Sequence, residues 1–418
     1  MKKILFLATC AVALTAFTGC TSDENLAEVP VTDPVAQAKG TPMTVVVPEN
    51  GDGTTTRYTA TTTTSLDYFQ LFAFNTTEVN NEPKGSYVIN ETFQRTGSNA
   101  NGGVFACAAA NWPETNTDVS NFFAISVNSS TGLGNNLTLP NAWTDGSTYT
   151  FDYAVPVKAT KETVGMPSGG NVVPSQQNVI DIDKTEDLLV SANTGIKEST
   201  TPQLSMDFTH ALCGVEISAR FTAEEWSTTV TPASPQTTGV DIGGIININY
   251  IALHGLYTSG TYDMATGVWS TNDATKNQAY YRYAFSPALQ IAAQSVTSAE
   301  EKIKRYVLVP DSKFLLIPQT IIPWNPAAND GESTLQGIGA GEADELGVAY
   351  IEINCSFTNV QGMTGTDSYY LPLQFSVNTL APGKKYKLLL NLNNLLYEAG
   401  NDGEGVLEQV FGDVIINT

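Results

Sequence analysis

The sequence predicts an all-β protein made of two tandem β-sandwich domains, and three observations predict it. Short runs rich in Val, Ile, Phe, Tyr and Thr recur along the chain, separated by segments rich in Gly, Asn and Pro. Apolar residues rarely recur at the spacing of a helix. With 418 residues, the chain is also too long for one hydrophobic core, so we expect two domains.

Residues 1–19 have the order of a secretory signal peptide. A pair of lysines precedes the apolar run Ile4–Phe17, which is too short to span a bilayer, and Thr18 and Gly19 lead to Cys20. This pattern is typical of a bacterial lipoprotein, in which Cys20 becomes the first mature residue and carries diacylglycerol and palmitate. Each buried methylene contributes roughly 0.8 kcal/mol, so such chains hold a domain at a membrane. An ordinary signal peptide cut nearby is the alternative.

The next segments are expected to form a tether, a strand and a loop. Residues 20–42 are acidic, contain prolines and lack an apolar period. Met43–Val47 has the composition of a strand. Residues 50–64 are rich in Gly and Thr, and Arg57 lies in this expected loop, where a protease would find it accessible.

The N-terminal domain is predicted over residues 43–225, and alternating apolar runs indicate its other strands. These are Tyr68–Phe74, Ser86–Phe93, Val104–Ala110, Phe122–Val127, Thr148–Val157, Leu188–Ala192 and Met206–Ala219. Turn-rich stretches such as residues 96–103 separate them.

The C-terminal domain is predicted over residues 226–418, with a short helix at Ser298–Lys304. Its expected strands are Ile245–Leu253, Gly260–Tyr262, Gly267–Ser270, Tyr281–Phe285, Tyr306–Pro310, Phe314–Ile322, Ala349–Phe357, Tyr369–Val377, Lys385–Leu392 and Leu407–Ile416.

The charge of the chain excludes one class of partner. The full sequence has 20 basic and 42 acidic residues. Loss of residues 1–19 removes two lysines and no acid, so 18 basic against 42 acidic residues leave a net charge of −24. Nucleic acid requires a basic surface, so we expect no nucleic-acid partner. The same repulsion opposes binding to anionic lipid through side chains.

The cysteines left in the mature chain indicate core positions. Besides Cys20 these are Cys107, Cys213 and Cys355, which are widely spaced and odd in number, so no disulfide framework or metal motif can be read from them. Cys107 and Cys213 lie among small apolar residues, which favours burial. A bond between these two stays open.

Residues able to do chemistry are few. The only histidines, His210 and His254, fall inside expected strands and are interpreted as structural, and no nucleophile elbow, zinc motif or phosphate loop is present. The acidic stretches 181–187 and 400–405 lack the pattern of a calcium loop and are interpreted as solvated turns. We therefore expect no enzyme, cofactor or metal.

Aromatic residues offer one other hypothesis. Tyr280, Tyr281, Tyr283 and Trp324 are candidates for a carbohydrate-binding surface, because aromatic rings stack on sugars. Strand alternation places Tyr281 and Tyr283 on one face, where a core-facing role is equally open.

Several stretches occur in an order that resembles the fimbrillin family, the lipoprotein-derived subunits of type V pili of Gram-negative anaerobes. They are NWP (111–113), FFAISV (122–127), FDYAVPV (151–157), DLLVSAN (187–193), DFTHALCGVEI (207–217), FLLIPQTI (314–321) and APGKKYKLLLNL (381–392). The resemblance implies two transthyretin-like sandwiches and an outer-membrane lipoprotein precursor. It also implies that the protein is finally located at the cell surface, as part of a fimbrium.

The resemblance also implies a way of assembling. A protease would cut after Arg57 and remove the first strand, whereas a cut after Lys39 would leave that strand in place. A neighbouring subunit would then insert its carboxy-terminal segment, which here is residues 406–416, as a head-to-tail donor strand. The donor residues on one face of that strand would be Val406, Val410, Val414 and Ile416. The last residues, 417–418, lack the aromatic that many relatives carry there.

The leading hypothesis is therefore a structural pilus subunit that supports cell adhesion, with related pilus subunits as partners and outer-membrane lipid as a partner through Cys20 before processing. A fimbrial anchor or tip accessory lipoprotein, or a glycan-binding surface lipoprotein, is the alternative. A host protein or glycan ligand stays open.

Overall fold

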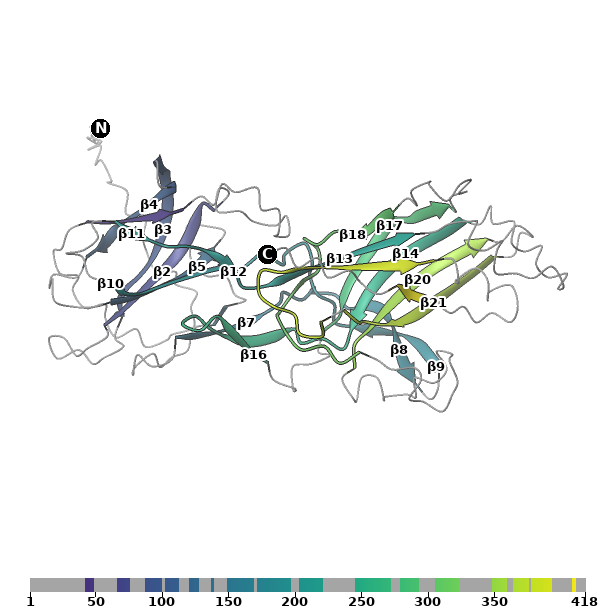
Figure 1. Ribbon diagram of the computed structural model, residues 1–418. Coiled ribbons are helices and arrows are strands. Elements are labelled where there is room, and N and C mark those ends of the chain that lie inside the picture. The colour runs from purple at the N-terminus through teal and green to yellow at the C-terminus, as the bar shows by residue number, and fades with distance from the viewer. Residues whose placement is uncertain are drawn as a thin grey trace, which may run out of the picture.

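The computed structural model describes the chain in segments. They are residues 42–48, 66–75, 87–99, 102–112, 120–127, 137–138, 149–168, 171–196, 203–220, 245–271, 279–292, 305–323, 348–358, 364–375, 377–392 and 408–410. Within these segments the chain forms strands, bridges and turns and contains no helix (Figure 1). The all-β prediction is confirmed. No helix in this part of the chain has the length and apolarity needed to cross a membrane.

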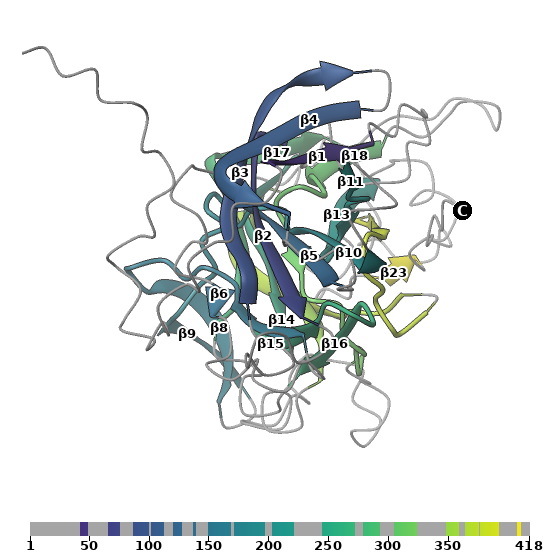
Figure 2. The ribbon, with the colours of Figure 1, turned by 90° about the vertical axis from the view of Figure 1, so that its left-hand side faces the viewer.

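An eight-stranded sheet occupies one end of the elongated molecule (Figure 1). Its strand order is β11-β1-β4-β3-β2-β5-β10-β12. The strands are β1 (Pro42–Val47), β2 (Tyr68–Asn75), β3 (Tyr87–Asn99), β4 (Gly102–Asn111), β5 (Ser120–Val127), β10 (Leu189–Ile196), β11 (Leu204–Ser205) and β12 (Thr209–His210). Figure 2 views the molecule from this end and shows β1 beside β4.

The alternation in β2 explains how this sheet serves two cores. Phe69 and Leu71 face a core that is shared with β1, β4 and the segment around β11. Phe72 and Phe74 point to the opposite face and join the larger core, which extends through the rest of the molecule. The eight-stranded sheet is therefore buried on both faces at its centre.

A four-stranded sheet covers that second face. Its order is β16-β15-β7-β6, formed by β6 (Leu137–Thr138), β7 (Thr150–Ala154), β15 (Ser259–Asp263) and β16 (Val268–Thr271). Tyr149 and Phe151 of this layer are buried in the larger core, and the Phe123 and Tyr149 ring centroids lie 4.3 Å apart. This packing joins the eight-stranded sheet to the remainder of the fold.

Two further sheets and a hairpin form the other end of the molecule. The β13 sheet has the order β18-β13-β22-β23, with β19 also paired to β13, and the β14 sheet has the order β17-β14-β20-β21. The strands are β13 (Cys213–Arg220), β14 (Ile245–His254), β17 (Tyr281–Ala292), β18 (Arg305–Val309), β19 (Leu315–Leu316), β20 (Tyr350–Thr358), β21 (Thr364–Pro372), β22 (Lys385–Asn391) and β23 (Glu408–Val410). Strands β8 (Glu162–Ser168) and β9 (Asn171–Gln177) pair as a hairpin.

Strands pair across residue 225. In the β13 sheet, β13 pairs parallel with β22, and in the four-stranded sheet of β6, β7, β15 and β16, β7 pairs antiparallel with β15. The sequence did not predict these partners, because it assigned β7 and β13 to one domain and β15 and β22 to the other. The expected boundary lies in residues 221–244, outside the described segments, and the domain division stays a prediction.

The expected strands differ from the observed ones at several places. Of the strand predicted over Phe314–Ile322 only β19 forms, and β21 runs from Thr364 to Pro372 where a strand was predicted over Tyr369–Val377. Strands β6, β8, β9 and β11 were not expected. The long strand predicted over Met206–Ala219 is interrupted at Ala211 and Leu212, where the chain leaves the eight-stranded sheet and enters the β13 sheet. The helix predicted at Ser298–Lys304 lies outside the described segments.

Candidate assembly site

Strand β1 occupies a slot between two other strands. It pairs antiparallel with β4, with Val45 opposite Phe105, and parallel with β11, with Val45 opposite Leu204. The Met206 amide donates a hydrogen bond to the Val46 carbonyl at 2.9 Å. Any strand that replaced β1 would therefore need to run antiparallel to β4 and parallel to β11.

The side chains of β1 are buried on both faces of the strand. Met43, Val45 and Val47 are at most 1% exposed and belong to the core beneath the slot. Val46 is 4% exposed and points to the opposite face, while Thr44 is half-buried. The slot thus accepts three consecutive apolar residues at its end, at positions 45, 46 and 47.

Aromatic rings form the floor of the slot. Phe69 lies at the centre, with its ring centroid 5.5 Å from Phe93, 4.9 Å from Phe105 and 5.3 Å from Phe208. All four rings are fully buried. Because these residues come from β2, β3, β4 and the segment after β11, the floor does not depend on β1.

The end of the slot is closed by a backbone contact at Gly102. This glycine has φ of +134°, and a Cβ atom there would lie 2.1 Å from the Val47 carbonyl oxygen. Only glycine tolerates both this backbone conformation and so close an approach. The start of β4 is therefore shaped around the last residue of β1.

Removal of β1 would be costly to the isolated fold. Burial of a Val or Met side chain contributes roughly 1.5–3 kcal/mol, and three such side chains would leave the core. The backbone groups of β4 and β11 that face β1 would also lose their partners. An emptied slot would thus strongly favour the entry of another apolar strand.

Most of the sequence-predicted site residues lie outside the described segments. They are Cys20, Lys39, Arg57, Val406, Val414 and Ile416. Val410 is the last residue of β23, and its backbone pairs with Leu389 of β22. The roles expected for all of these residues stay predictions.

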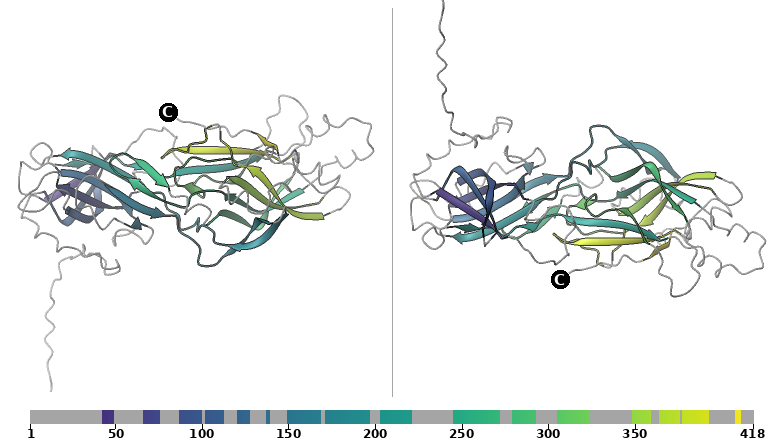
Figure 3. Two further views of the ribbon diagram at one scale, coloured as in Figure 1. Left: turned by 90° about the horizontal axis from the view of Figure 1, so that it is seen from below. Right: turned by 90° about the horizontal axis from the view of Figure 1, so that it is seen from above.

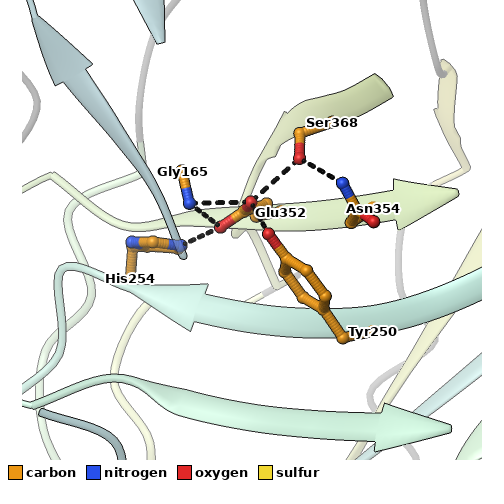
Figure 4. A network of polar contacts seen from close by, with 6 residues as sticks. All are labelled: Gly165, Tyr250, His254, Glu352, Asn354 and Ser368. Atoms are coloured by element: carbon orange, nitrogen blue, oxygen red, sulfur yellow. Dashed lines mark hydrogen bonds and ion pairs between the residues drawn. The ribbon is translucent and has the colours of Figure 1, made fainter. Parts of the chain in front are cut away.

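The sequence analysis missed a buried polar cluster around Glu352 (Figure 4). One carboxylate oxygen of Glu352, Oε1, accepts hydrogen bonds from the Tyr250 hydroxyl at 2.6 Å, the Ser368 hydroxyl at 3.0 Å and the Gly165 amide at 2.9 Å. The other, Oε2, lies 2.9 Å from His254 Nε2 and 3.1 Å from the Gly165 amide. Glu352 and His254 are both completely buried.

This cluster ties the hairpin to the β14 sheet. Gly165 belongs to β8, whereas Tyr250 and His254 lie on β14 and Glu352 on β20. The His254 ring stacks on Tyr350 at 4.3 Å between centroids. Burial, and then the charge of Glu352, raises the pKa of Tyr250. A carboxylate so enclosed serves to hold elements together, because no solvent-exposed face remains for a substrate.

The hairpin has two additional contacts with the same sheet. Glu162 of β8 forms an ion pair with Arg282, and the Arg282 guanidinium lies 4.1 Å from the centroid of the Tyr250 ring. Val164 packs in a small core with Tyr250 and Tyr280. The hydrogen bonds to Glu352, the ion pair of Glu162 and the apolar contacts of Val164 thus all hold the hairpin against the β14 sheet.

The remaining chemical candidates are engaged in structural contacts. His210 Nδ1 lies 2.6 Å from the Asp187 carboxylate, and both side chains are buried. The acidic stretch also pairs Asp183 with Lys313 at 2.5 Å, and the hydrogen bond from Lys313 lowers the pKa of Asp183. Among the described residues no group of three or more His, Cys, Asp or Glu side chains could hold a metal ion.

The three described cysteines are buried thiols without a disulfide bond. Cys107 belongs to the core beneath β1, while Cys213 and Cys355 belong to the larger core. The Cys107–Cys213 bond left open by the sequence is therefore absent, because the eight-stranded sheet lies between the two cores.

The aromatic residues proposed for carbohydrate binding do not form an exposed platform. Tyr280 is 3% exposed and Tyr281 is completely buried. Tyr283 is half-buried against the larger core, with its ring edge-on to Phe285 at 5.1 Å. Trp324 lies outside the described segments. Tyr281 thus faces the core, which is one of the two roles that strand alternation left open for Tyr281 and Tyr283, and Tyr280 is buried as well.

The chain is similar to one family model and to several proteins of known structure. A family model described as fimbrillin-like matches residues 56–409. A fimbrial protein from Bacteroides vulgatus has 13% identity and a TM-score of 0.48, and the match covers 88% of this chain and 99% of that one. A proposed cell adhesion protein from Bacteroides uniformis has 14% identity and a TM-score of 0.37 over 88% and 96% of the two chains. One from Bacteroides eggerthii has 11% identity and a TM-score of 0.39 over 91% and 95%. No curated protein matches the sequence.

Proposed function

The chain belongs to the fimbrillin-like family, and we propose that it is a structural subunit of a surface fimbria that assembles by donor-strand exchange and supports cell adhesion. The observation that carries this proposal is the slot between β4 and β11. A strand in this position contributes backbone pairs and a row of buried side chains, which are what an exchanged strand must supply. The subunit performs no chemistry beyond this exchange.

Proteolysis after Arg57 opens the slot. Arg57 lies between Val47, at the end of β1, and Tyr68, at the start of β2, so a cut there severs β1 from the rest of the chain. A cut after Lys39 would leave β1 attached and its side chains in the core. The position of the cut therefore decides whether a subunit can accept a donor.

The carboxy-terminal segment supplies the donor strand. Within residues 406–416, only Val414, Ile415 and Ile416 are three consecutive apolar residues. They match the three consecutive buried residues of β1, Val45–Val47. This alignment places Asp413 at the half-buried position of Thr44 and Gly412 at the buried position of Met43. It adds Ile415 to the predicted donor residues and leaves Val406 and Val410 before the position at which β1 begins.

The same proposal accounts for location and partners. Cys20 carries the lipid that holds the precursor at the outer membrane, and the cut after Arg57 releases the folded domain from that lipid. The donor and acceptor surfaces differ, so the contact is heterologous and propagates from head to tail among like or related subunits. The mature protein then lies at the cell surface in a fimbrium.

Two complementary variants test the exchange. A chain truncated after residue 405 can accept a strand and cannot donate one. An Arg57→Ala chain keeps β1, so it can donate and cannot accept. Each variant alone should give monomers, whereas the two produced together should give a heterodimer that grows no further. The Lys39→Ala chain is the matched control and should polymerise like the unmodified protein.

Size-exclusion chromatography and mass spectrometry of the amino terminus provide the readout. The accepting chain should begin at Tyr58. Polymers formed by the Arg57→Ala chain would overturn the processing step, and polymers formed by the truncated chain would overturn the donor assignment. A monomer that remains lipidated at Cys20 would instead support the anchor alternative. A processed subunit that accepts and cannot donate would support a tip.

A further inference from the structure

We propose that the parallel pair β13–β22 transmits the pulling force through the subunit and is loaded in shear when the filament is under tension. This inference rests on the head-to-tail assembly proposed above, because that assembly fixes where force enters and leaves each subunit. Force enters at the slot between β4 and β11. It leaves through the segment that follows β22 and contains the donor residues.

The direction of the two strands determines how the force acts. β22 points away from the eight-stranded sheet, as the long yellow arrow in Figures 1 and 3 shows. β13 is parallel to it and begins where the chain leaves the eight-stranded sheet. Tension thus pulls β13 at its first residue and β22 at its last, in opposite directions along the strand axis. The strands must slide past one another, so all ladder hydrogen bonds are loaded together.

The ladder between the two strands is continuous. It runs without a register shift from Gly214 opposite Lys385 to Arg220 opposite Asn391. The Gly214 amide donates to the Lys384 carbonyl and the Leu392 amide donates to the Arg220 carbonyl, each at 3.0 Å. Both ends of the pair are therefore closed by hydrogen bonds.

Packing on one face resists sliding. Val215, Ile217, Tyr386, Leu388 and Leu390 are at most 2% exposed and belong to the larger core. A slip by one residue would turn each of these side chains toward the opposite face. The pair must therefore break many apolar contacts before it can move to a new register.

Charged side chains add a second restraint. Lys385 Nζ lies 3.0 Å from Glu216 and 2.7 Å from Asp311, and Lys387 Nζ lies 3.4 Å from Glu216. Glu216 is on β13 and both lysines are on β22. Any sliding displaces these ion pairs along with the backbone.

Neighbouring elements hold β13 while β22 is pulled. The Val215 amide donates to the Phe314 carbonyl at 2.9 Å on the other side of β13. Just before β13, Trp269 Nε1 donates to the Ala211 carbonyl at 2.7 Å, and the Gly383 amide donates to the Leu212 carbonyl at 2.8 Å. β23 pairs antiparallel with only the last residues of β22, so it peels away pair by pair before the shear begins.

Single-molecule stretching of the monomeric Arg57→Ala chain, which keeps β1, tests this inference. One handle is attached at Ser98, an exposed residue of β3, and the other after Thr418. A cysteine pair, Glu216→Cys with Lys387→Cys, joins β13 to β22 at opposed positions. The control pair, Ser218→Cys with Val307→Cys, joins β13 to β18, again at opposed positions.

The β13–β22 crosslink should shift the main unfolding peak to higher force, and reduction should restore the original force in the same molecules. The β13–β18 crosslink should leave the peak force unchanged. Each crosslink prevents the residues between its two cysteines from being stretched out. The gain in chain length on unfolding should therefore be shorter by roughly 3.3–3.6 Å for each of those residues, and this shortening verifies that the crosslink has formed.

An unchanged peak force with the β13–β22 crosslink would overturn the inference, because another element would then give way first. Since the measurement uses a monomer, it does not depend on polymerisation. A chain that shows the shift and forms no heterodimer in the complementation experiment would refute the proposed function alone.

Discussion

At the scale of single residues, the side chains of β1 have a role that depends on the state of the chain. They complete the core of the uncut protein, yet the proposed function removes them from the mature subunit. Substitutions at two neighbouring residues distinguish the uncut chain from the mature subunit. Val45 is completely buried, whereas Thr44 is half-buried.

Val45→Ala should lower the free energy of unfolding of the uncut chain by roughly 1–3 kcal/mol, because it removes buried methyl groups. Thr44→Ala should change it by less than about 0.5 kcal/mol. In polymers assembled after the cut, Val45→Ala should have no effect on stability. Urea titration of both forms measures this, and an equal loss in the polymer would mean that β1 is retained.

Ile415 provides a second residue-scale prediction. Ile415→Ser should shorten or abolish polymers, because it places a hydroxyl at the buried position now filled by Val46. Phe411→Ser is the matched control, since the alignment places Phe411 at the exposed position of Pro42. Polymer length by size-exclusion chromatography distinguishes them, and equal effects of the two substitutions would contradict the alignment.

Lys385 makes the stability of the β13–β22 pair depend on pH. Burial alone would lower its pKa, but hydrogen bonds to Asp311 and Glu216 outweigh burial and raise the pKa above its ordinary value of 10.5. A raised lysine pKa stabilises the fold fully below about pH 10.5, and this contribution is lost as pH rises through the folded-state value.

Lys385→Met should therefore cost about 1 kcal/mol near neutral pH, because the pairs are partly in contact with water. The difference from the unmodified chain should shrink as the pH rises above about 10.5. Lys384→Met is the control, because Lys384 forms no ion pair in the described part of the chain. A difference that stays constant with pH would show that the ammonium charge is not responsible.

At the scale of elements, the β8–β9 hairpin depends on one buried carboxylate. Glu352→Gln replaces a carboxylate, which accepts through both oxygens, by an amide with only one acceptor oxygen, so one of the groups that now face Oε1 and Oε2 loses its acceptor. A buried polar group left without its partner costs roughly 1–3 kcal/mol.

Hydrogen exchange should locate this loss. In Glu352→Gln, exchange at Gly165 and along β8 and β9 should rise well above that of β14 and β20. Glu162→Gln removes the more exposed ion pair with Arg282 and should have a smaller effect in the same segments. Uniform loss of protection across all sheets would instead show that the cluster supports the whole fold.

The elements also show how far sequence reasoning extends. Alternation within a single strand is a local property, so strands such as β2, β4, β14 and β20 were predicted close to their observed bounds. The hairpin was missed because Pro167 and Pro174 interrupt its runs, and proline argues against a strand. The partners of Glu352 were missed because Gly165 and His254 lie 187 and 98 residues away along the chain. The sequence offered one signal of this cluster, which is the charged residue Glu352 between Ile351 and Ile353 in an expected strand.

At the scale of the whole molecule, the larger core extends to both sides of the boundary predicted at residue 225, and that boundary stays a prediction. It contains Phe72 and Phe123 from the eight-stranded sheet together with Leu388 from β22, and the pairs β7–β15 and β13–β22 cross the same point. Two fragments, 43–225 and 226–392, would each expose the part of this core that they contribute.

We therefore expect each fragment produced alone to be insoluble or to lack a cooperative thermal transition, and the intact mature chain to unfold in one transition. Circular dichroism and calorimetry measure this. Two independent transitions in the intact chain, matched by the separate fragments, would show that the halves fold independently in spite of the shared core.

The slot of β1 has a final consequence for the lifetime of the assembly. A subunit that loses β1 by cleavage of a peptide bond cannot return to its original monomeric fold, because the strand that completed it is gone. Detachment from a neighbour would lead only to an incomplete sheet with an aromatic floor open to water. Such a filament would not exchange subunits with a soluble pool. Its subunits would stay in the order in which they were added, and it would be shortened by breakage rather than by dissociation.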